Sequence, residues 1–515
     1  MKLNAEEQKF TINNLIGQKT KNVFIEGNII IPDVKPDILR TIDSTGNICI
    51  YKKDVMDGKV KIDGGINLYL IYLPDSDVDT QRGINTTLDF SQLIEVEECK
   101  SNMDMNSVFK IKQIECNVLN GRKVKVKVEM EIIIQIYSRE EINFFSDVGN
   151  INNIQMLKEQ MQINTLIGCG EAKLNARDTI AYTGAENLVE ILKVNLNIVN
   201  KETKISFNKV LIKADLNVKI IYLTDIGEVN VLNSNIPVIG FVDIPNVIDE
   251  NIVITSYEIR NMLIKPKLGN EHTIDLDIEV GAYCSAYGIA NLELIQDMYS
   301  TEENIEFTTN NIEIESNKCV RKTIFNINES ISIPEISNNK IYDVDIKPVL
   351  NNVNILNKKI IYEGEIILKF LFDSNMNSGI EIKRYVCPFN FEMEDDCIKN
   401  SQKVDTEIEC LSGDYTIISD GNIDCKIDLQ FNTEISDIQQ IRLIDKINVS
   451  NELGESNCNM VIHRIKQGDT LWNIAKKYKT TVENIIKINS LEDDNLNIGK
   501  KIYIQRNSNN KKSIA

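Results

Sequence analysis

Similar apolar segments recur along this chain of 515 residues at a spacing of 150 residues. The segments are KVKIDGGINLYLIYLPD (59–75), KVLIKADLNVKIIYLTD (209–225) and KKIIYEGEIILKFLFD (358–373), whose apolar runs close on Tyr72, Tyr222 and Phe372. INNLIG (12–17) also recurs as INTLIG (163–168), at an offset of 151 residues. Repetition at a fixed period is typical of chains built from copies of one structural unit. We therefore predict three copies of one domain, at 23–145, 177–295 and 321–437.

The segments outside the three copies complete the expected domain organisation, since several domains are expected in a chain of this length. They are an N-terminal segment (1–22), two connectors (146–176 and 296–320), a linker (438–459), a C-terminal module (460–506) and a disordered tail (507–515). The two connectors are candidates for helices.

Within each copy the apolar residues alternate with polar ones. The clearest run is RKVKVKVEMEIIIQIY (122–137), in which every second residue from Val124 to Ile136 is apolar and Lys or Glu stands at most positions between. This period of two predicts a half-buried strand of an antiparallel sheet. HTIDLDIEV (272–280) and NIDCKIDLQF (422–431) repeat the pattern, each close behind a Gly–Asn pair typical of a hairpin. We expect a mainly β body of three antiparallel β-sandwich-like domains.

The C-terminal module has a different pattern, strand–helix–helix–strand. VIHRI is a short strand, and Leu471, Ile474, Ala475 and Tyr478 then form the apolar stripe of a helix. Thr470 is placed to cap this helix, and Thr480 with Glu483 forms a capping box for a second one. NIGKKIYI supplies a turn and a closing strand. The module is therefore expected to be a small α+β domain of βααβ order.

The run GDTLW, Asn489 and the late Gly499 resemble the LysM family over roughly 44 residues. In LysM domains that bind glycans, the groove lies between the loop after the first strand and the loop after the second helix. The resemblance implies the groove residues Gly468, Asp469, Thr470, Leu471, Asn489, Ser490 and Leu491, with the segment that continues to Ile498. The alternative is that a turn and a helix cap alone require the residue types of 468–471.

A second candidate site on the module is a patch for a protein partner. Alternation in the first strand places Met460 and Ile462 on the face opposite Ile465. Trp472, the only Trp of the chain, lies about 100° from the helix stripe. An aromatic anchor with a basic rim is typical of protein interfaces. The patch comprises Trp472, Met460, Ile462, Lys466, Lys476 and Lys477. The alternative is that Trp472 covers the small core of the module.

The repeats also resemble a known family. IPDVKPDILRTIDSTGNICI (31–50), with the strand that follows it, resembles the SPOCS domain of spore-coat-associated proteins in spore-forming Firmicutes. The second copy has NLVEILKVN (187–195) in the equivalent region, and the third has DVDIKPVLNN (343–352). No residue of this pattern carries chemistry, so the resemblance rests on pattern and order.

Charge and composition narrow the function. The formal net charge is −19, but residues 461–515 carry eleven Lys and Arg against five Asp and Glu, so the body carries −25. This distribution argues against nucleic-acid binding by the body and favours an acidic partner for the tail. Glu6, Glu7 and Lys9 stand where a signal peptide needs apolar residues, and no apolar run is long enough for a transmembrane segment. The 11 scattered cysteines are typical of free thiols in a reducing compartment.

No catalytic constellation is recognisable. The chain has two histidines, His272 and His463, both expected to be exposed or at strand edges rather than catalytic. Neither has the neighbours of a Ser-His-Asp triad or of a zinc site. No phosphate-binding glycine loop is present, and the frequent acidic pairs are expected on a solvated surface. We predict no enzyme activity, no cofactor and no metal.

SPOCS-like copies followed by a LysM module resemble a family of clostridial spore-coat morphogenetic proteins. The resemblance implies an adaptor in the cytoplasm of the mother cell, acting at the forespore surface and spore coat. Its LysM domain would bind the coat ATPase called stage IV sporulation protein A, alongside other coat proteins. The alternative is a peptidoglycan-binding protein that anchors spore components to cortex or cell wall. A third reading, a wall hydrolase, is disfavoured by the repeats and the shortage of histidine.

Overall fold

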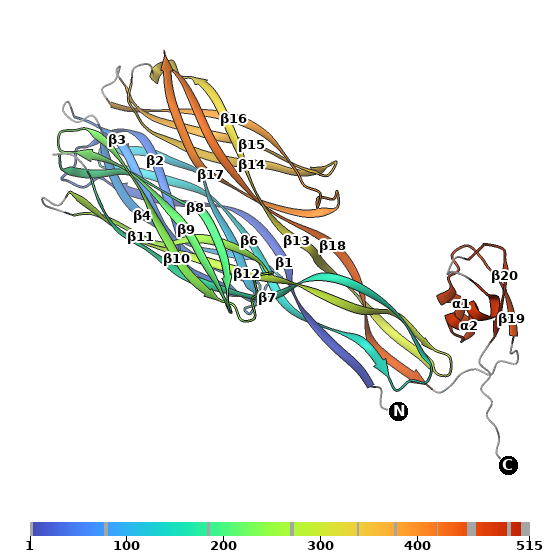
Figure 1. Cartoon of the computed structure of the whole chain (residues 1–515). Helices are drawn as coiled ribbons and strands as arrows, with labels where there is room; N and C mark the ends of the chain where they lie inside the picture. Colours follow the sequence, from blue (N-terminus) through green and yellow to red (C-terminus); the bar gives the residue numbers. More distant parts are fainter. Residues whose placement is uncertain are drawn as a thin grey trace.

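Period-two alternation produces long antiparallel strands over the first 450 residues of the chain (Figure 1). The computed structural model describes residues 4–76, 81–182, 186–267, 272–336, 339–374, 379–419, 421–450, 460–491 and 496–505. The molecule is elongated, and its two described α-helices lie in the C-terminal module (Figure 1). The expected tail at 507–515 lies outside the described residues.

The body consists of three repeats of six strands. Repeat 1 comprises β1 (Asn4–Ile30), β2 (Ile38–Met56), β3 (Lys59–Pro74), β4 (Arg82–Glu95), β5 (Asp104–Asn120) and β6 (Lys123–Gly149). Repeat 2 comprises β7 (Ile154–Ala181), β8 (Leu188–Ser206), β9 (Lys209–Thr224), β10 (Val229–Asp243), β11 (Ile252–Pro266) and β12 (Thr273–Ser300). Repeat 3 comprises β13 (Asn304–Ser332), the short 3₁₀ helix η1 (Pro334–Ile336), β14 (Ile341–Leu356), β15 (Lys359–Ser374), β16 (Gly379–Glu394), β17 (Gln402–Ser419) and β18 (Asn422–Ser450).

Each repeat divides its strands between two three-stranded sheets. The first strand pairs with the sixth and the sixth with the fifth, while the second, third and fourth strands form a meander. All pairings are antiparallel. Apolar side chains from both sheets form one core in each repeat. The expected mainly β body of repeated antiparallel domains is therefore confirmed.

β6 shows how alternation produces such a core. Its side chains at every second position from Val124 to Ile136 are all fully buried, and they pack against the apolar face of β3. Intervening residues such as Lys125 and Lys127 lie on the other face and are exposed or half-buried. Full burial of one such aliphatic side chain stabilises the fold by about 1.5–3 kcal/mol.

The segments expected to be connectors are strands, so the expectation of helices there is wrong. β1, β7 and β13 each run for 27 to 29 residues and pair with β6, β12 and β18 along almost their whole length. The expected boundaries at 23, 177 and 321 consequently lie inside strands. The physical reason is that the outer halves of these ribbons bury apolar side chains against one another, including Phe10, Ile163 and Ile314. We call this three-ribbon bundle the stalk.

The three repeats enclose a common centre. Ile71, Ile221 and Leu371, which are spaced 150 residues apart, pack in one buried cluster. Each repeat also contacts both others in the stalk, where one apolar cluster draws residues from all three. The repeats are thus arranged as a quasi-threefold assembly within one chain.

The C-terminal module has the expected βααβ order. It comprises β19 (Met460–Arg464), α1 (Leu471–Tyr478), α2 (Val482–Asn489) and β20 (Lys501–Gln505). β19 and β20 pair antiparallel, and both helices pack on the inner face of this small sheet. Across the residues that the structure describes, no helix has the length and apolar character needed to span a membrane.

Candidate functional site at the C-terminal module

Helix α1 begins and ends as its sequence predicts. The Thr470 side chain caps it by accepting a hydrogen bond from the Asn473 backbone N–H at 3.1 Å. Leu471, Ile474 and Ala475 are buried. The preceding turn contains Gly468 at φ +88°, a conformation that favours glycine. This geometry fixes the direction in which the neighbouring residues of α1 point.

Helix α2 differs from the prediction at its first residue. Its cap is Thr481, whose side chain accepts from the Asn484 N–H at 3.1 Å, and the expected cap Thr480 is fully buried. The reason is that Lys479 takes a left-handed conformation and ends α1, which turns Thr480 inward. The Thr480 carbonyl accepts a hydrogen bond from a residue of the body, Tyr299.

Several of the implied groove residues are engaged inside the module. One Asp469 carboxylate oxygen accepts from the Lys466 N–H and contacts His463 Nε2, both at 2.8 Å. The hydrogen bond with His463 has the largest effect on the pKa of Asp469, and it lowers this pKa together with the hydrogen bond from the Lys466 N–H. The Asn489 amide bonds Ile485 and both backbone groups of Tyr503, joining α2 to β20. These two polar residues of the groove are therefore also part of the fold.

The remaining groove residues are mixed in exposure. Gly468, Thr470 and Ser490 are exposed, whereas Leu471 is buried in the core of the module. Leu491 is half-buried, and residues 492–495 of the second loop lie outside the described part of the chain. His463 lies in β19, an edge strand of the two-stranded sheet, which is one of the two placements expected for it, and its side chain is buried, at 7% exposed. The cause is its position between Asp469 and the Tyr478 hydroxyl, which it contacts through its second ring nitrogen at 3.1 Å.

The expected partner patch is divided between two faces. Met460 and Ile462 are 59% and 58% exposed, on the outer face of the β19–β20 sheet. Tyr503, which pairs with Ile462 across the sheet, is 49% exposed beside them. Lys466 and Lys477 are also exposed. Tyr503 was missed by the sequence analysis, although its alternation with the buried Ile502 and Ile504 indicates the same outward face.

Trp472 and Lys476 lie on a second face, directed at the body. The Trp472 indole N–H donates to one carboxylate oxygen of Asp297 at 2.8 Å, and the Lys476 ammonium contacts the other at 2.5 Å. The Lys476 ammonium also lies 5.4 Å from the centre of the Phe307 ring. No local pattern in the sequence indicates Asp297 or Phe307, because they lie in a segment expected to be a connector.

Tyr299 completes this contact from strand β12. Its ring packs edge-on against Trp472 with ring centres 5.0 Å apart, and its hydroxyl donates to the Thr480 carbonyl at 2.8 Å. Burial, reinforced by Asp297, raises the pKa of Tyr299 to about 12, so the phenol remains a donor. Tyr299 packs in the same apolar cluster as the core of the module. The body thus supplies a side chain to the module.

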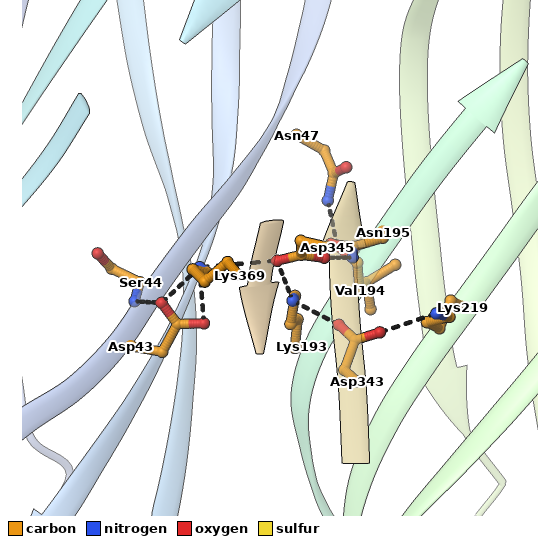
Figure 2. Close-up of polar contacts among 10 residues, drawn as sticks. All are labelled: Asp43, Ser44, Asn47, Lys193, Val194, Asn195, Lys219, Asp343, Asp345 and Lys369. Carbon is orange, nitrogen blue, oxygen red and sulfur yellow. Dashed lines mark hydrogen bonds and ion pairs between the residues drawn. The ribbon is translucent and has the colours of Figure 1, made fainter. Parts of the chain in front are cut away.

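A second polar cluster holds the three repeats together (Figure 2). Carboxylates and ammonium groups alternate along it, with adjoining members in contact. Their order is Asp43, Lys369, Asp345, Lys193, Asp343 and Lys219, so repeat 1 contributes one residue, repeat 2 two and repeat 3 three. We call these six residues the central ion-pair chain. It balances three positive charges with three negative ones.

The buried members of the central ion-pair chain are strongly perturbed. Burial alone raises the pKa of Asp343, but the ammonium groups of Lys193 and Lys219 outweigh it and lower the pKa to about 2. For Lys193, burial favours the neutral form, and the Asp345 and Asp343 carboxylates outweigh it and raise the pKa. Both side chains are therefore charged at neutral pH. Removing one member would leave a buried charge without its partner, so such a cluster is costly to break.

The repeats also meet around a polar cavity of about 90 Å³. Tyr137 of repeat 1 and Tyr287 of repeat 2, at positions 150 residues apart, line it together with Lys318, Lys403 and Glu315 of repeat 3. Both lysines contact the Glu315 carboxylate, at 3.1 and 2.7 Å. In the part of the chain that the structure describes, no group of three or more His, Cys, Asp and Glu is arranged to hold a metal ion. The cavity is a polar junction between repeats.

Repeated antiparallel β domains with a C-terminal βααβ module define a class of multidomain protein that carries a LysM-type binding module. Comparison with protein families gives the particular assignment. Residues 37–119 and 188–267 match the SPOCS domain of SipL, and residues 463–505 match the LysM domain. The chain therefore has the SipL-like architecture that the resemblance implied. No curated protein and no solved structure matches the chain.

The two SPOCS matches correspond to equivalent parts of the fold. The first extends from β2 to β5 and the second from β8 to β11. Repeat 3 lies outside these matches but has the same order of six strands. Both matched families are non-catalytic. Together they indicate a sporulation-related adaptor with a capacity to bind peptidoglycan.

Proposed function

We propose that this protein is a non-enzymatic adaptor of endospore coat assembly. It acts in the cytoplasm of the mother cell, at the forespore surface, where its LysM module binds stage IV sporulation protein A, the coat morphogenetic ATPase. The three β repeats provide a rigid body that other coat proteins contact. The SPOCS and LysM matches support the sporulation part of this proposal, and the surface of the module supports the choice of a protein partner.

The observation that carries the choice of partner is the outer face of the β19–β20 sheet. Met460, Ile462 and Tyr503 form an apolar surface that no described part of the body covers. Two of its neighbours on the same face, Arg464 and Lys501, are basic and exposed. Large apolar side chains inside a basic rim are typical of a protein interface with an acidic partner. The net charge of +6 over residues 461–515 acts in the same direction.

The test is co-precipitation of the full-length chain with the ATPase. Ile462→Glu places a charge at the centre of the apolar face, and we expect binding to weaken by about 2 kcal/mol or more, the size of an interface hot spot. The matched control is Ile226→Glu, since Ile226 is 63% exposed in the β9–β10 turn, far along the chain from the module. Equal binding by both variants would contradict the proposal.

Peptidoglycan is the second candidate ligand, because Gly468, Thr470 and Ser490 are exposed where the LysM resemblance places the glycan groove. In that case the protein anchors spore components to cortex or cell wall. The two proposals separate cleanly, because the groove lies in the loops and the apolar face lies on the outside of the sheet. Ile462→Glu is expected to leave binding to purified peptidoglycan unchanged.

A further inference from the structure

Beside the Phe307 ring, the body meets the module with an extended segment, Asp297-Met298-Tyr299, near the end of β12. Side chains alternate along a strand, so its first and third residues share a face. Met298 is fully buried in an apolar cluster at the end of the stalk. Asp297 and Tyr299 face the module instead, and both contact Trp472.

The module receives this segment with complementary groups. Both carboxylate oxygens of Asp297 are satisfied, one by the indole N–H and one by the Lys476 ammonium. The Tyr299 ring meets Trp472 edge-on, and its hydroxyl reaches a backbone carbonyl of the module. A carboxylate followed two residues later by a phenol thus contacts Trp472, Lys476 and the Thr480 carbonyl together. An extended acidic–aromatic segment is a ligand of defined chemistry.

The quasi-threefold body contains a partial copy of this segment that does not contact the module. Subtracting the repeat spacing of 150 residues from Asp297 and Tyr299 gives Asp147 and Gly149 in β6. The carboxylate recurs there but the ring does not. β18 begins 149 residues after β12, so its equivalent positions are Lys446 and Asn448. Of the three ribbons of the stalk, the one formed by β7 and β12 carries both the carboxylate and the phenol. These two side chains make hydrogen bonds to the module.

We propose that the Trp472–Lys476 face is a receptor for an extended Asp-x-Tyr segment, and that the chain occupies it with its own Asp297 and Tyr299. This rests on the proposed function, in which the module binds a protein. A partner that presents the same acidic–aromatic chemistry must displace the β12 segment before it reaches this face. The body then acts as a resident competitor, which lowers the apparent affinity by the fraction of molecules in which the face is free.

Trp472 is the only Trp of the chain and reports directly on this contact. Asp297→Lys places an ammonium group opposite Lys476 and releases the module. In the full-length chain we expect a red shift of Trp emission and greater quenching by acrylamide. Asp147→Lys, the same change at the equivalent position, is the matched control and leaves the emission unchanged. Unchanged emission in Asp297→Lys, with an unaltered circular dichroism spectrum, overturns the proposal.

The receptor itself is tested with a synthetic peptide of residues 293–301, ELIQDMYST, which contains no Trp. We expect this peptide to bind the Asp297→Lys chain roughly tenfold more tightly than the wild-type chain. This ratio corresponds to a wild-type chain in which the Trp472–Lys476 face is free in about a tenth of the molecules. A peptide with the changes Asp297→Asn and Tyr299→Ala is the control and does not bind. Equal affinity of both peptides for the released chain overturns the proposal.

The coat ATPase, added as a competitor of the peptide, separates the proposal from the proposed function. Displacement of the peptide supports both. Peptide binding with no binding of the ATPase to any variant supports the receptor and contradicts the proposed function. If the ATPase instead binds the wild-type and Asp297→Lys chains equally and leaves the peptide bound, that outcome supports the adaptor and overturns competition at this face. Displacement of the peptide by soluble peptidoglycan fragments alone overturns the assignment of a protein ligand.

Discussion

Lys193 and Asp343 form an ion pair with an N–O distance of 2.6 Å although both side chains are excluded from solvent. They occupy corresponding positions of repeats 2 and 3, and the same position of repeat 1 is Asp43, since the three residues are spaced 150 apart. Three identical copies would place three like charges near the centre of the assembly. Three linked but different copies allow the charges to alternate, so this pair fixes which repeat stands beside which.

The first prediction concerns the loss of this pair. Lys193→Ala leaves Asp343 buried with Lys219 as its remaining partner, and breaking a buried pair costs about 3–5 kcal/mol. We expect a lower midpoint of denaturant unfolding, measured by circular dichroism. Lys209→Ala is the matched control because the Lys209–Asp243 pair is exposed, and its loss changes stability by less than about 1 kcal/mol. Equal midpoints for the two variants would show that the central ion-pair chain does not hold the repeats.

The second prediction concerns acid stability. The folded-state pKa of Asp343, about 2, lies below its ordinary value of 3.8, so the ionised carboxylate stabilises the fold above pH 4. That contribution, about 2 kcal/mol, is lost as pH falls from about 4 to about 2. Asp343→Asn lacks it at every pH. We therefore expect the stability difference between the wild-type chain and Asp343→Asn to shrink over this interval. A difference that stays constant down to pH 2 would contradict the assigned pKa.

The third prediction concerns the stalk. Leu294 is 1% exposed in the apolar cluster shared by the three ribbons. Leu294→Ala removes buried methyl groups and leaves a cavity, which costs about 2–5 kcal/mol. Hydrogen exchange is expected to accelerate in the outer halves of β1, β7 and β13 and to change little inside the sandwiches. The neighbouring Glu293→Ala, on the exposed side of the same strand, serves as control. Uniform acceleration over the whole body would indicate that the stalk is not a separate cooperative unit.

The fourth prediction separates folding from binding at Asn489. Its amide makes three hydrogen bonds to backbone groups of α2 and β20. Asn489→Ala leaves these groups unsatisfied and is expected to destabilise the module by about 1–3 kcal/mol. Asn497→Ala, at an exposed Asn of the same module, is the comparison. The stability of the module is measured by following Trp472 fluorescence during unfolding. If Asn489→Ala loses ligand binding while the module stays fully stable, Asn489 acts in ligand binding and not in folding.

The sequence predicts those parts of the structure that depend on local periodicity. The 150-residue spacing gives three repeats, and alternation from Val124 to Ile136 gives a strand with one buried face. The stripe that begins at Leu471 gives helix α1. The predicted cap of α2 is one residue too early, because Thr480 and Thr481 are equally able to cap and the left-handed Lys479 turns Thr480 inward.

The parts that escape prediction depend on pairing between distant segments. The outer half of β1 has few apolar residues, and its strand character comes from pairing with β6 more than a hundred residues away. Asp297 and Trp472 are separated by 175 residues, and neither has a local pattern that indicates the other. Tyr503 is a different case: its alternation with the buried Ile502 and Ile504 indicates its outward face, whereas its place beside Ile462 depends on the pairing of β19 with β20.

The most direct test of the adaptor proposal compares the two ligands on the same protein. Full-length wild-type chain is incubated in parallel with the immobilised coat ATPase and with purified peptidoglycan, and the bound fraction is measured for each. We predict retention on the ATPase, with loss in Ile462→Glu, and little sedimentation with peptidoglycan. Sedimentation with peptidoglycan and no retention on the ATPase would contradict the adaptor and establish the wall-anchoring alternative.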